Sequence, residues 1–126
     1  MTTTHPMAGS VRVVSKRQGG TAALTDETVI DVDRVNPVLG NRHILRNHHD
    51  DAERAVVIGA YEADFEADVA RKGPMFQAVM ALAARAAGGE RLALRCWCAP
   101  KACHADLLAA NIAELALVQS LTPTNN

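Results

Sequence analysis

Three short stretches of this chain alternate apolar and polar residues, and three longer ones repeat apolar residues every three or four positions. Alternation and β-branched side chains predict strands at residues 11–15 and 28–33. A third strand is expected at residues 92–98, where leucines and cysteines share one face and Arg95 and Trp97 the other. Gly19-Gly20 is a strong turn signal and separates the first two strands.

The longest apolar repeat predicts a helix that begins after Asp50. Asp50 and Glu53 form a variant of the capping box, and Lys72-Gly73-Pro74 ends the repeat. The apolar stripe consists of Ala55, Ile58, Tyr61, Phe65 and Val69. The acidic side chains are expected on the solvent-exposed face: Glu62, Asp64, Glu66 and Asp68.

Two further helices are expected at residues 74–87 and from Pro100 to about residue 119. The order strand, strand, helix, helix, strand, helix predicts a small single-domain α/β sandwich, with a short parallel or mixed sheet flanked by helices. The domain is expected to cover residues 10–121, between flexible ends at residues 1–9 and 122–126.

Composition narrows the class of protein. The 126 residues are 48% hydrophobic and 21% charged, with a formal net charge of −1, which is typical of a soluble globular domain. No basic tract indicates non-specific binding to nucleic acid, and no apolar run has the length of a membrane span. We therefore expect a cytoplasmic protein with a small-molecule ligand and no membrane partner. A homo-oligomer is compatible with the aliphatic helices.

All three cysteines and the only tryptophan lie within residues 96–103. Three cysteines so close together do not resemble a secreted disulfide framework. A proline at the start of a helix places Cys103 and His104 in its first turn, where the free N–H groups favour a thiolate. Cys103 is therefore the cysteine expected to have a lowered pKa.

This pattern supports a catalytic or ligand-binding thiol. Cys98 at the end of the strand and Cys103 at the start of the helix would face one pocket, with His104 as a candidate base. Adjacent helical residues usually point apart, so a distant histidine or the helix terminus would serve Cys103 better than His104. A reversible disulfide between Cys98 and Cys103 is a further alternative.

The same residues also suggest a metal site. Cys96, Cys98, Cys103 and His104 form a Cys3His set, which is a known zinc ligand set. Sulfur atoms that share a zinc ion lie about 3.8 Å apart, whereas same-face neighbours in a strand are separated by nearly 7 Å, so the strand would have to curl at Cys98.

A third interpretation is structural. Cys96 then belongs to the core beside Leu92 and Leu94, and the other cysteines are small buried hydrophobic residues. His104 is a hydrogen-bonded core histidine, and Trp97 covers the opposite face of the sheet. The sequence leaves the three interpretations open.

Residues 96–106 read Cys-Trp-Cys-Ala-Pro-Lys-Ala-Cys-His-Ala-Asp. This segment resembles the C-W-C-x-P-x-x-C-H-x-D signature of a family of small phage and bacterial proteins known as domain of unknown function 4326. Asp33-Arg34, Gly40-Asn41 and Tyr61 resemble the family's earlier motifs, so the resemblance covers roughly residues 28–117. It implies a phage-related protein but no established activity. Arg42-His43 stands where the family usually has Pro-Phe, which would give the loop an added anion contact.

The leading hypothesis is a protein that binds or modifies a nucleotide-like or other phosphorylated small molecule. Its pocket would lie between residues 34–41 and 98–104, at strand ends where α/β sheets usually bind ligands. Arg34, Asn41 and Asp106 would contact the phosphate or sugar. The alternative is a non-enzymatic interaction module in which the cysteine turn is structural, with or without zinc.

Overall fold

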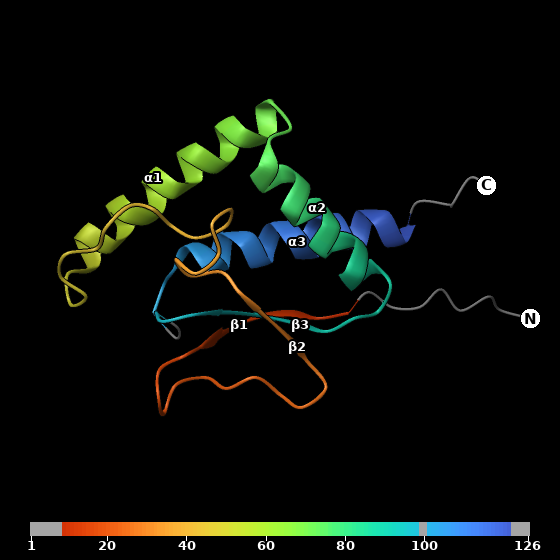
Figure 1. Ribbon diagram of the computed structural model, residues 1–126, viewed down its shortest axis with the longest axis horizontal. Helices are drawn as coiled ribbons and strands as arrows, with labels where there is room; N and C mark the ends of the chain where they lie inside the picture. Colours follow the sequence, from red (N-terminus) through yellow and green to blue (C-terminus); the bar gives the residue numbers. More distant parts are fainter. Residues whose placement is uncertain (1–8, 99–100, 122–126) are drawn as a thin grey trace, which may run out of the picture.

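A computed structural model describes residues 9–98 and 101–121, in which three parallel strands and three helices form one small α/β unit (Figure 1). The elements are β1 (Val11–Ser15), β2 (Thr28–Asp31), α1 (Asp51–Ala70), α2 (Pro74–Ala87), β3 (Leu92–Cys96) and α3 (His104–Leu121). Pro100 and almost all of the predicted flexible ends lie outside the described residues. None of the helices in residues 9–98 and 101–121 has the length and apolar character needed to cross a membrane.

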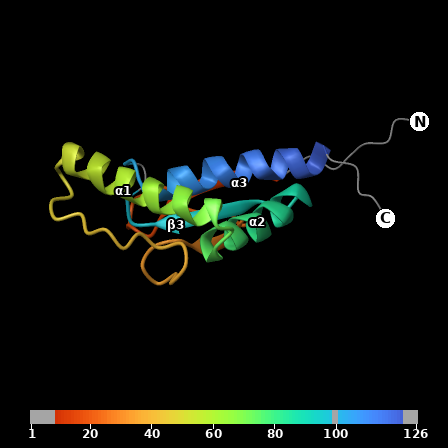
Figure 2. The same ribbon diagram turned by 90° about the horizontal axis from the view of Figure 1, so that it is seen from above.

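The sheet has the order β1-β3-β2, and both pairs of strands are parallel. Leu92 of β3 is opposite Val11 on one side and Thr28 on the other. The α/β prediction is therefore confirmed, with a parallel rather than a mixed sheet. Figure 1 shows the helices over one face of the sheet and the connection from β1 to β2 on the other side. Seen from above, the three helices lie side by side over the strands (Figure 2).

The core lies between β3 and the helices. Leu92, Leu94 and Cys96 are buried there, as the predicted alternation requires, and Arg95 and Trp97 are more exposed on the other face. From the helical layer the core receives residues such as Tyr61, Phe65, Val79, Leu108 and Ile112. Trp97 is more than half exposed, so the prediction that it covers the opposite face of the sheet is wrong.

Several predicted element ends are wrong. β2 ends at Asp31 and β3 at Cys96, two residues earlier than expected in each case, and α3 begins at His104 rather than at Pro100. Capping explains the late start of α3. The carboxylate of Asp106 accepts a hydrogen bond from the N–H of Cys103 at 3.0 Å, and the N–H of Asp106 donates to the carbonyl of Cys103 at 3.0 Å. Cys103 is therefore the residue that caps the helix and is not part of its first turn.

Helix α1 begins as the capping box predicts, because the Asp50 carboxylate accepts a hydrogen bond from the N–H of Glu53 at 3.0 Å. Its buried face differs from the predicted stripe, since Arg54 is buried and Ala55 is exposed. Asp68 is also buried rather than exposed. Its carboxylate accepts a hydrogen bond from the N–H of Phe76 at 2.7 Å and so caps α2, which has no side-chain cap of its own.

The loop after β2 folds closely on itself around Gly40. A Cβ atom at this position would lie 2.5 Å from the carbonyl oxygen of Asp33, so only glycine fits. The reason is close approach and not the positive φ that turn chemistry suggests, because the described residues with positive φ are Gly19, Lys72 and Gly89. The side-chain oxygen of Asn36 closes the turn by accepting a hydrogen bond from the N–H of Leu39 at 2.8 Å.

The side chain of Glu27 stabilises the connection between β1 and β2 through hydrogen bonds. Its carboxylate accepts hydrogen bonds from Arg12 at 2.7 and 2.6 Å and one from the N–H of Leu24 at 2.8 Å. The hydrogen bonds from Arg12 and the N–H of Leu24 outweigh the effect of burial and lower the pKa of Glu27 from 4.5 to about 2.

Replacing Glu27 with glutamine is expected to lower the free energy of unfolding by about 1–3 kcal/mol at about pH 7. The pKa of the folded state is the lower one, so this stabilisation is present above pH 4.5 and is lost as the pH falls toward about 2. Urea denaturation at about pH 7 and about pH 3 measures the effect, with exposed Glu66→Gln as the control. A difference between wild type and variant that stays constant over this range contradicts the assignment.

Candidate functional site

The order of the strands brings two loops together. Because β2 and β3 are parallel neighbours, the segments that follow them, residues 32–43 and residues 97–98 with 101–103, lie at the same edge of the sheet. The start of α1 forms a third side, and a cavity of about 400 Å³ lies between these segments. Its polar lining includes Asp33, Arg34, Asn41, His43, His48 and Arg54, and its apolar lining includes Ile44, Leu45, Val57 and Ile58.

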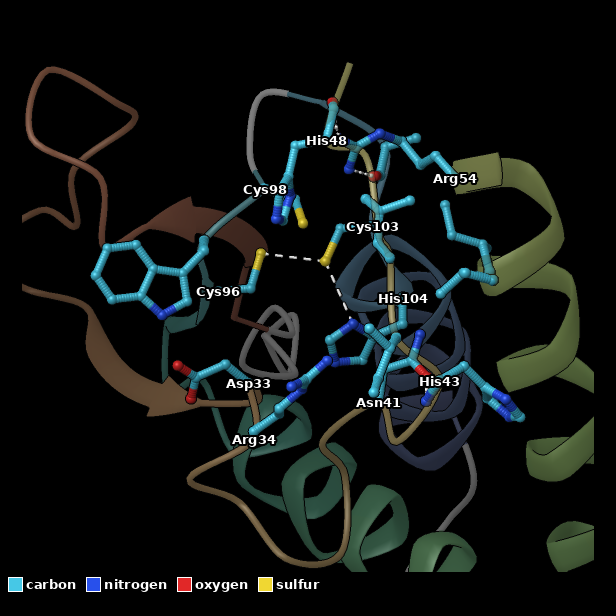
Figure 3. Close-up of a pocket in the computed structure, with 16 residues that line it drawn as sticks. Asp33, Arg34, Asn41, His43, His48, Arg54, Cys96, Cys98, Cys103 and His104 are labelled. Carbon is cyan, nitrogen blue, oxygen red and sulfur yellow. Dashed lines mark hydrogen bonds between the residues drawn. The ribbon is translucent and has the colours of Figure 1, made fainter. Parts of the chain in front are cut away.

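One wall of the cavity is formed by Cys96, Cys98, Cys103 and His104, which we call the Cys/His cluster. The sulfur atoms of Cys96 and Cys103 are 3.2 Å apart, and the Cys103 sulfur is 3.3 Å from Nδ1 of His104. The sulfur of Cys98 is within hydrogen-bonding reach of both other sulfurs. Figure 3 shows the three sulfur atoms and the imidazole ring turned toward one another.

The cluster forms because β3 ends earlier and α3 begins later than the sequence predicts. β3 ends at Cys96, so Cys98 lies in a bend and its sulfur is not held one strand repeat away from that of Cys96. Cys103 precedes the helix, so its side chain does not follow the helical divergence from His104. The expectation that His104 points away from Cys103 is therefore wrong.

The protonation of His104 follows from its contacts. Nε2 lies 2.6 Å from the carbonyl oxygen of Val32, which can only accept a hydrogen bond, so Nε2 carries a proton. Burial lowers the pKa of His104, and the ring is neutral at pH 7. Its Nδ1 therefore presents a lone pair to the Cys103 sulfur. The ring of Tyr61 packs against the imidazole, with centroids 4.8 Å apart, and holds its orientation.

Among the described cysteines of the cluster, Cys98 is the one whose pKa is lowered. Hydrogen bonds from Cys103 and Cys96, supported by Arg54, lower the pKa of Cys98 well below its usual value. The hydrogen bonds to Cys96 and Cys98, together with burial, raise the pKa of Cys103. The prediction that Cys103 has the lowered pKa is therefore wrong, because contacts between the sulfur atoms outweigh the effect of the helix terminus.

Arg54 is a residue of the site that sequence reasoning missed. It is 6% exposed and donates hydrogen bonds to the carbonyl oxygens of Ala102 at 3.1 Å and His48 at 2.8 Å. Its Nε is buried and has no hydrogen-bond partner among the described residues. One signal was present in the sequence, since Arg54 is four residues before Ile58 and seven before Tyr61 and thus falls on the apolar stripe.

The predicted ligand-binding residues are only partly brought together. Arg34 and Asn41 line the cavity, whereas Asp106 does not and instead caps α3. Arg42 also lies outside the cavity lining and donates a hydrogen bond to the carbonyl of Pro37 at 3.2 Å. His43 does line it, and its Nε2 lies 2.6 Å from the carboxylate of Asp64.

Within residues 9–98 and 101–121, no group of three or more cysteine, histidine, aspartate or glutamate side chains has the geometry of a metal site. In the Cys/His cluster, the distance between the sulfur atoms of Cys96 and Cys103 explains this result. Sulfur atoms on one zinc ion lie about 3.8 Å apart, which is wider than the 3.2 Å between Cys96 and Cys103.

A comparison with protein families identifies the chain's relatives. The family model described as Domain of unknown function (DUF4326) matches residues 14–114. The chain belongs to the DUF4326 family. The match begins in β1, earlier than the resemblance from residue 28 suggests, and includes every residue that lines the cavity. No curated protein and no solved structure matches the chain.

In this member of the DUF4326 family, the motifs noted in the sequence converge at one edge of the sheet. Arg34 and Asn41 line the cavity together with four residues of the signature, Cys96, Cys98, Cys103 and His104. Tyr61 stabilises the loop after β2, because its hydroxyl donates a hydrogen bond to the carbonyl of Leu39 at 2.7 Å.

Proposed function

We propose that this DUF4326 protein binds a phosphorylated small molecule of nucleotide size in the cavity between the loop after β2 and the residues around Cys98 and Cys103. The observation that carries the proposal is the pair of arginines on the cavity wall, Arg34 and Arg54. Guanidinium groups suit phosphate oxygens because they donate several hydrogen bonds in a fixed plane. Neither the side chain of Arg34 nor Nε of Arg54 has a hydrogen-bond partner among the described residues, so both retain donors for a ligand.

The charge balance of the cavity favours an anion, although the whole chain has a net charge of −1. Asp33 is the carboxylate in the lining, and its Oδ2 is already paired with Lys16 at 2.7 Å. Arg54 interacts with Cys98, whose pKa is lowered, whereas Arg34 has no acidic partner among the described residues, so its charge is available to an anion.

The remaining lining suits the uncharged part of a nucleotide. Ile44, Val57 and Ile58 supply apolar surface for a base, and Asn41 adds polar atoms for a sugar. A volume of about 400 Å³ lies in the range of roughly 300–1,000 Å³ that is common for small-molecule sites.

Calorimetry of the purified chain with nucleoside monophosphates and diphosphates tests the proposal, and the matching nucleosides show whether binding needs the phosphate. Arg34→Ala is expected to weaken nucleotide binding at least about tenfold, because it removes charge-assisted hydrogen bonds of about 1.5–3 kcal/mol. Arg17→Ala is the matched control, since Arg17 is exposed and lies outside the cavity lining.

Two results would overturn the proposal. One is the absence of binding for every nucleotide tested. The other is binding that Arg34→Ala and Arg17→Ala weaken equally, which would indicate a general charge effect and no specific site.

A further inference from the structure

The Cys/His cluster contains more donor atoms than a ligand pocket or a hydrophobic core requires. A buried cysteine that acts only as a small apolar residue needs no partner for its sulfur. Here the sulfur atoms of Cys96 and Cys103 are in contact, the sulfur of Cys98 is turned toward them (Figure 3), and the neutral imidazole directs an unprotonated nitrogen at Cys103. Three thiols and one imidazole nitrogen are the ligand set of a Cys3His zinc site.

We propose that the Cys/His cluster binds one zinc ion through its three sulfur atoms and Nδ1 of His104. This inference goes beyond the proposed ligand site, because the metal would bind within the wall of the cavity and not in its open volume.

The orientation of His104 supports the proposal. Histidines that bind zinc usually donate their second ring N–H to a carboxylate or a backbone carbonyl, which fixes the tautomer and the ring. Nε2 of His104 makes such a hydrogen bond with the carbonyl of Val32 at 2.6 Å, and the Tyr61 ring holds the imidazole from the side. The histidine is therefore already in the tautomer and orientation that a metal requires.

The sulfur atoms need only a small displacement. Ligands of one zinc ion are separated by about 3.8 Å between sulfurs and about 3.6 Å between sulfur and nitrogen. The corresponding distances are 3.2 Å from Cys96 to Cys103 and 3.3 Å from Cys103 to His104. The Cys96–Cys103 distance would increase by about 0.6 Å and the Cys103–His104 distance by about 0.3 Å. Side-chain rotation at Cys96, which ends β3, and at Cys103, which precedes α3, can supply both changes.

Charge and spacing are also compatible with zinc. Three thiolates and one Zn²⁺ have a net charge of −1, and the guanidinium of Arg54, which contacts Cys98, offsets it in a buried setting. Four residues separate Cys98 from Cys103, within the usual spacing of paired zinc ligands.

Native mass spectrometry of the full chain tests this proposal, with protein purified under reducing conditions from zinc-supplemented medium and without chelator. We expect one zinc ion per chain, lost on denaturation. Cobalt(II) added to chelator-treated protein should give the intense thiolate charge-transfer bands and the visible spectrum of a tetrahedral site. This second measurement on the wild-type chain does not depend on whether a variant folds.

Variants locate the metal. Cys98→Ser and His104→Asn are expected to weaken zinc binding at least about tenfold, whereas His43→Ala, on the same cavity but outside the cluster, should leave it unchanged. A metal-free wild-type chain would overturn the proposal. So would a mass lower by two hydrogen atoms, which indicates a disulfide, or zinc binding that only His43→Ala abolishes. Nucleotide binding is measured separately with Arg34→Ala, so the two proposals can fail independently.

Discussion

Replacing Tyr61 with alanine is expected to lower the free energy of unfolding by about 3–5 kcal/mol, because a large buried ring is removed and the space cannot fully collapse. Tyr61 is 2% exposed and joins three parts of the molecule. It lies on α1, packs against His104 at the start of α3, and donates a hydrogen bond to Leu39 in the loop after β2. Urea denaturation followed by circular dichroism measures the effect.

Tyr61→Phe separates the two contributions of this side chain. The ring remains, but the buried carbonyl of Leu39 loses its donor, so the expected loss is only about 1–2 kcal/mol. If the two Tyr61 variants lose equal stability, the ring contributes nothing and the account of the packing is wrong. Leu121→Ala, at an exposed apolar position on α3, serves as the control and should change the stability by less than about 0.5 kcal/mol.

Replacing Arg54 with methionine is expected to affect both stability and ligand binding. Methionine keeps much of the buried volume but cannot donate to the carbonyls of Ala102 and His48, which should cost about 2–4 kcal/mol. It also removes one of the two guanidinium groups of the cavity, so nucleotide binding should weaken at least about tenfold. Chemical denaturation and calorimetry measure the two effects separately.

Arg71→Met is the matched control for Arg54, since both arginines belong to the α1 region. Arg71 is largely exposed, and its ion pair with Asp68 is long, at 3.4 Å, so its loss should change stability by less than about 1 kcal/mol. It lies outside the cavity lining and should leave nucleotide binding unchanged. Equal effects of the two variants would show that Arg54 has no special role in the site.

The two proposals share one structural basis. The parallel sheet places the ends of β2 and β3 side by side, so the loop that carries Arg34 and the turn that carries Cys98 form one cavity. Arg54 connects both features, because it lines the cavity and also contacts the Cys98 sulfur. The metal site would then hold the turn in place, and the loop after β2 would supply the ligand contacts.

The sequence determined the elements and their class. Alternation along β3 placed Leu92 and Leu94 in the core, and the pair Asp50 and Glu53 marked the start of α1. These signals are local: they depend on side-chain period and on hydrogen bonds between residues a few positions apart. The same reasoning identified the cysteine segment and the Arg34 loop as two parts of one site, because parallel strands end at a common edge.

Only the tertiary structure decided which of these side chains are buried and which contact one another. It placed Arg54 on the buried face of α1 and used Asp106 as a cap, and neither outcome follows from local propensity. It ended β3 at Cys96 and started α3 at His104, which brought the sulfur atoms and the imidazole into contact. Where an element ends decides whether the residues beyond it still follow the geometry of that strand or helix, and only the packing of the whole chain fixes those ends.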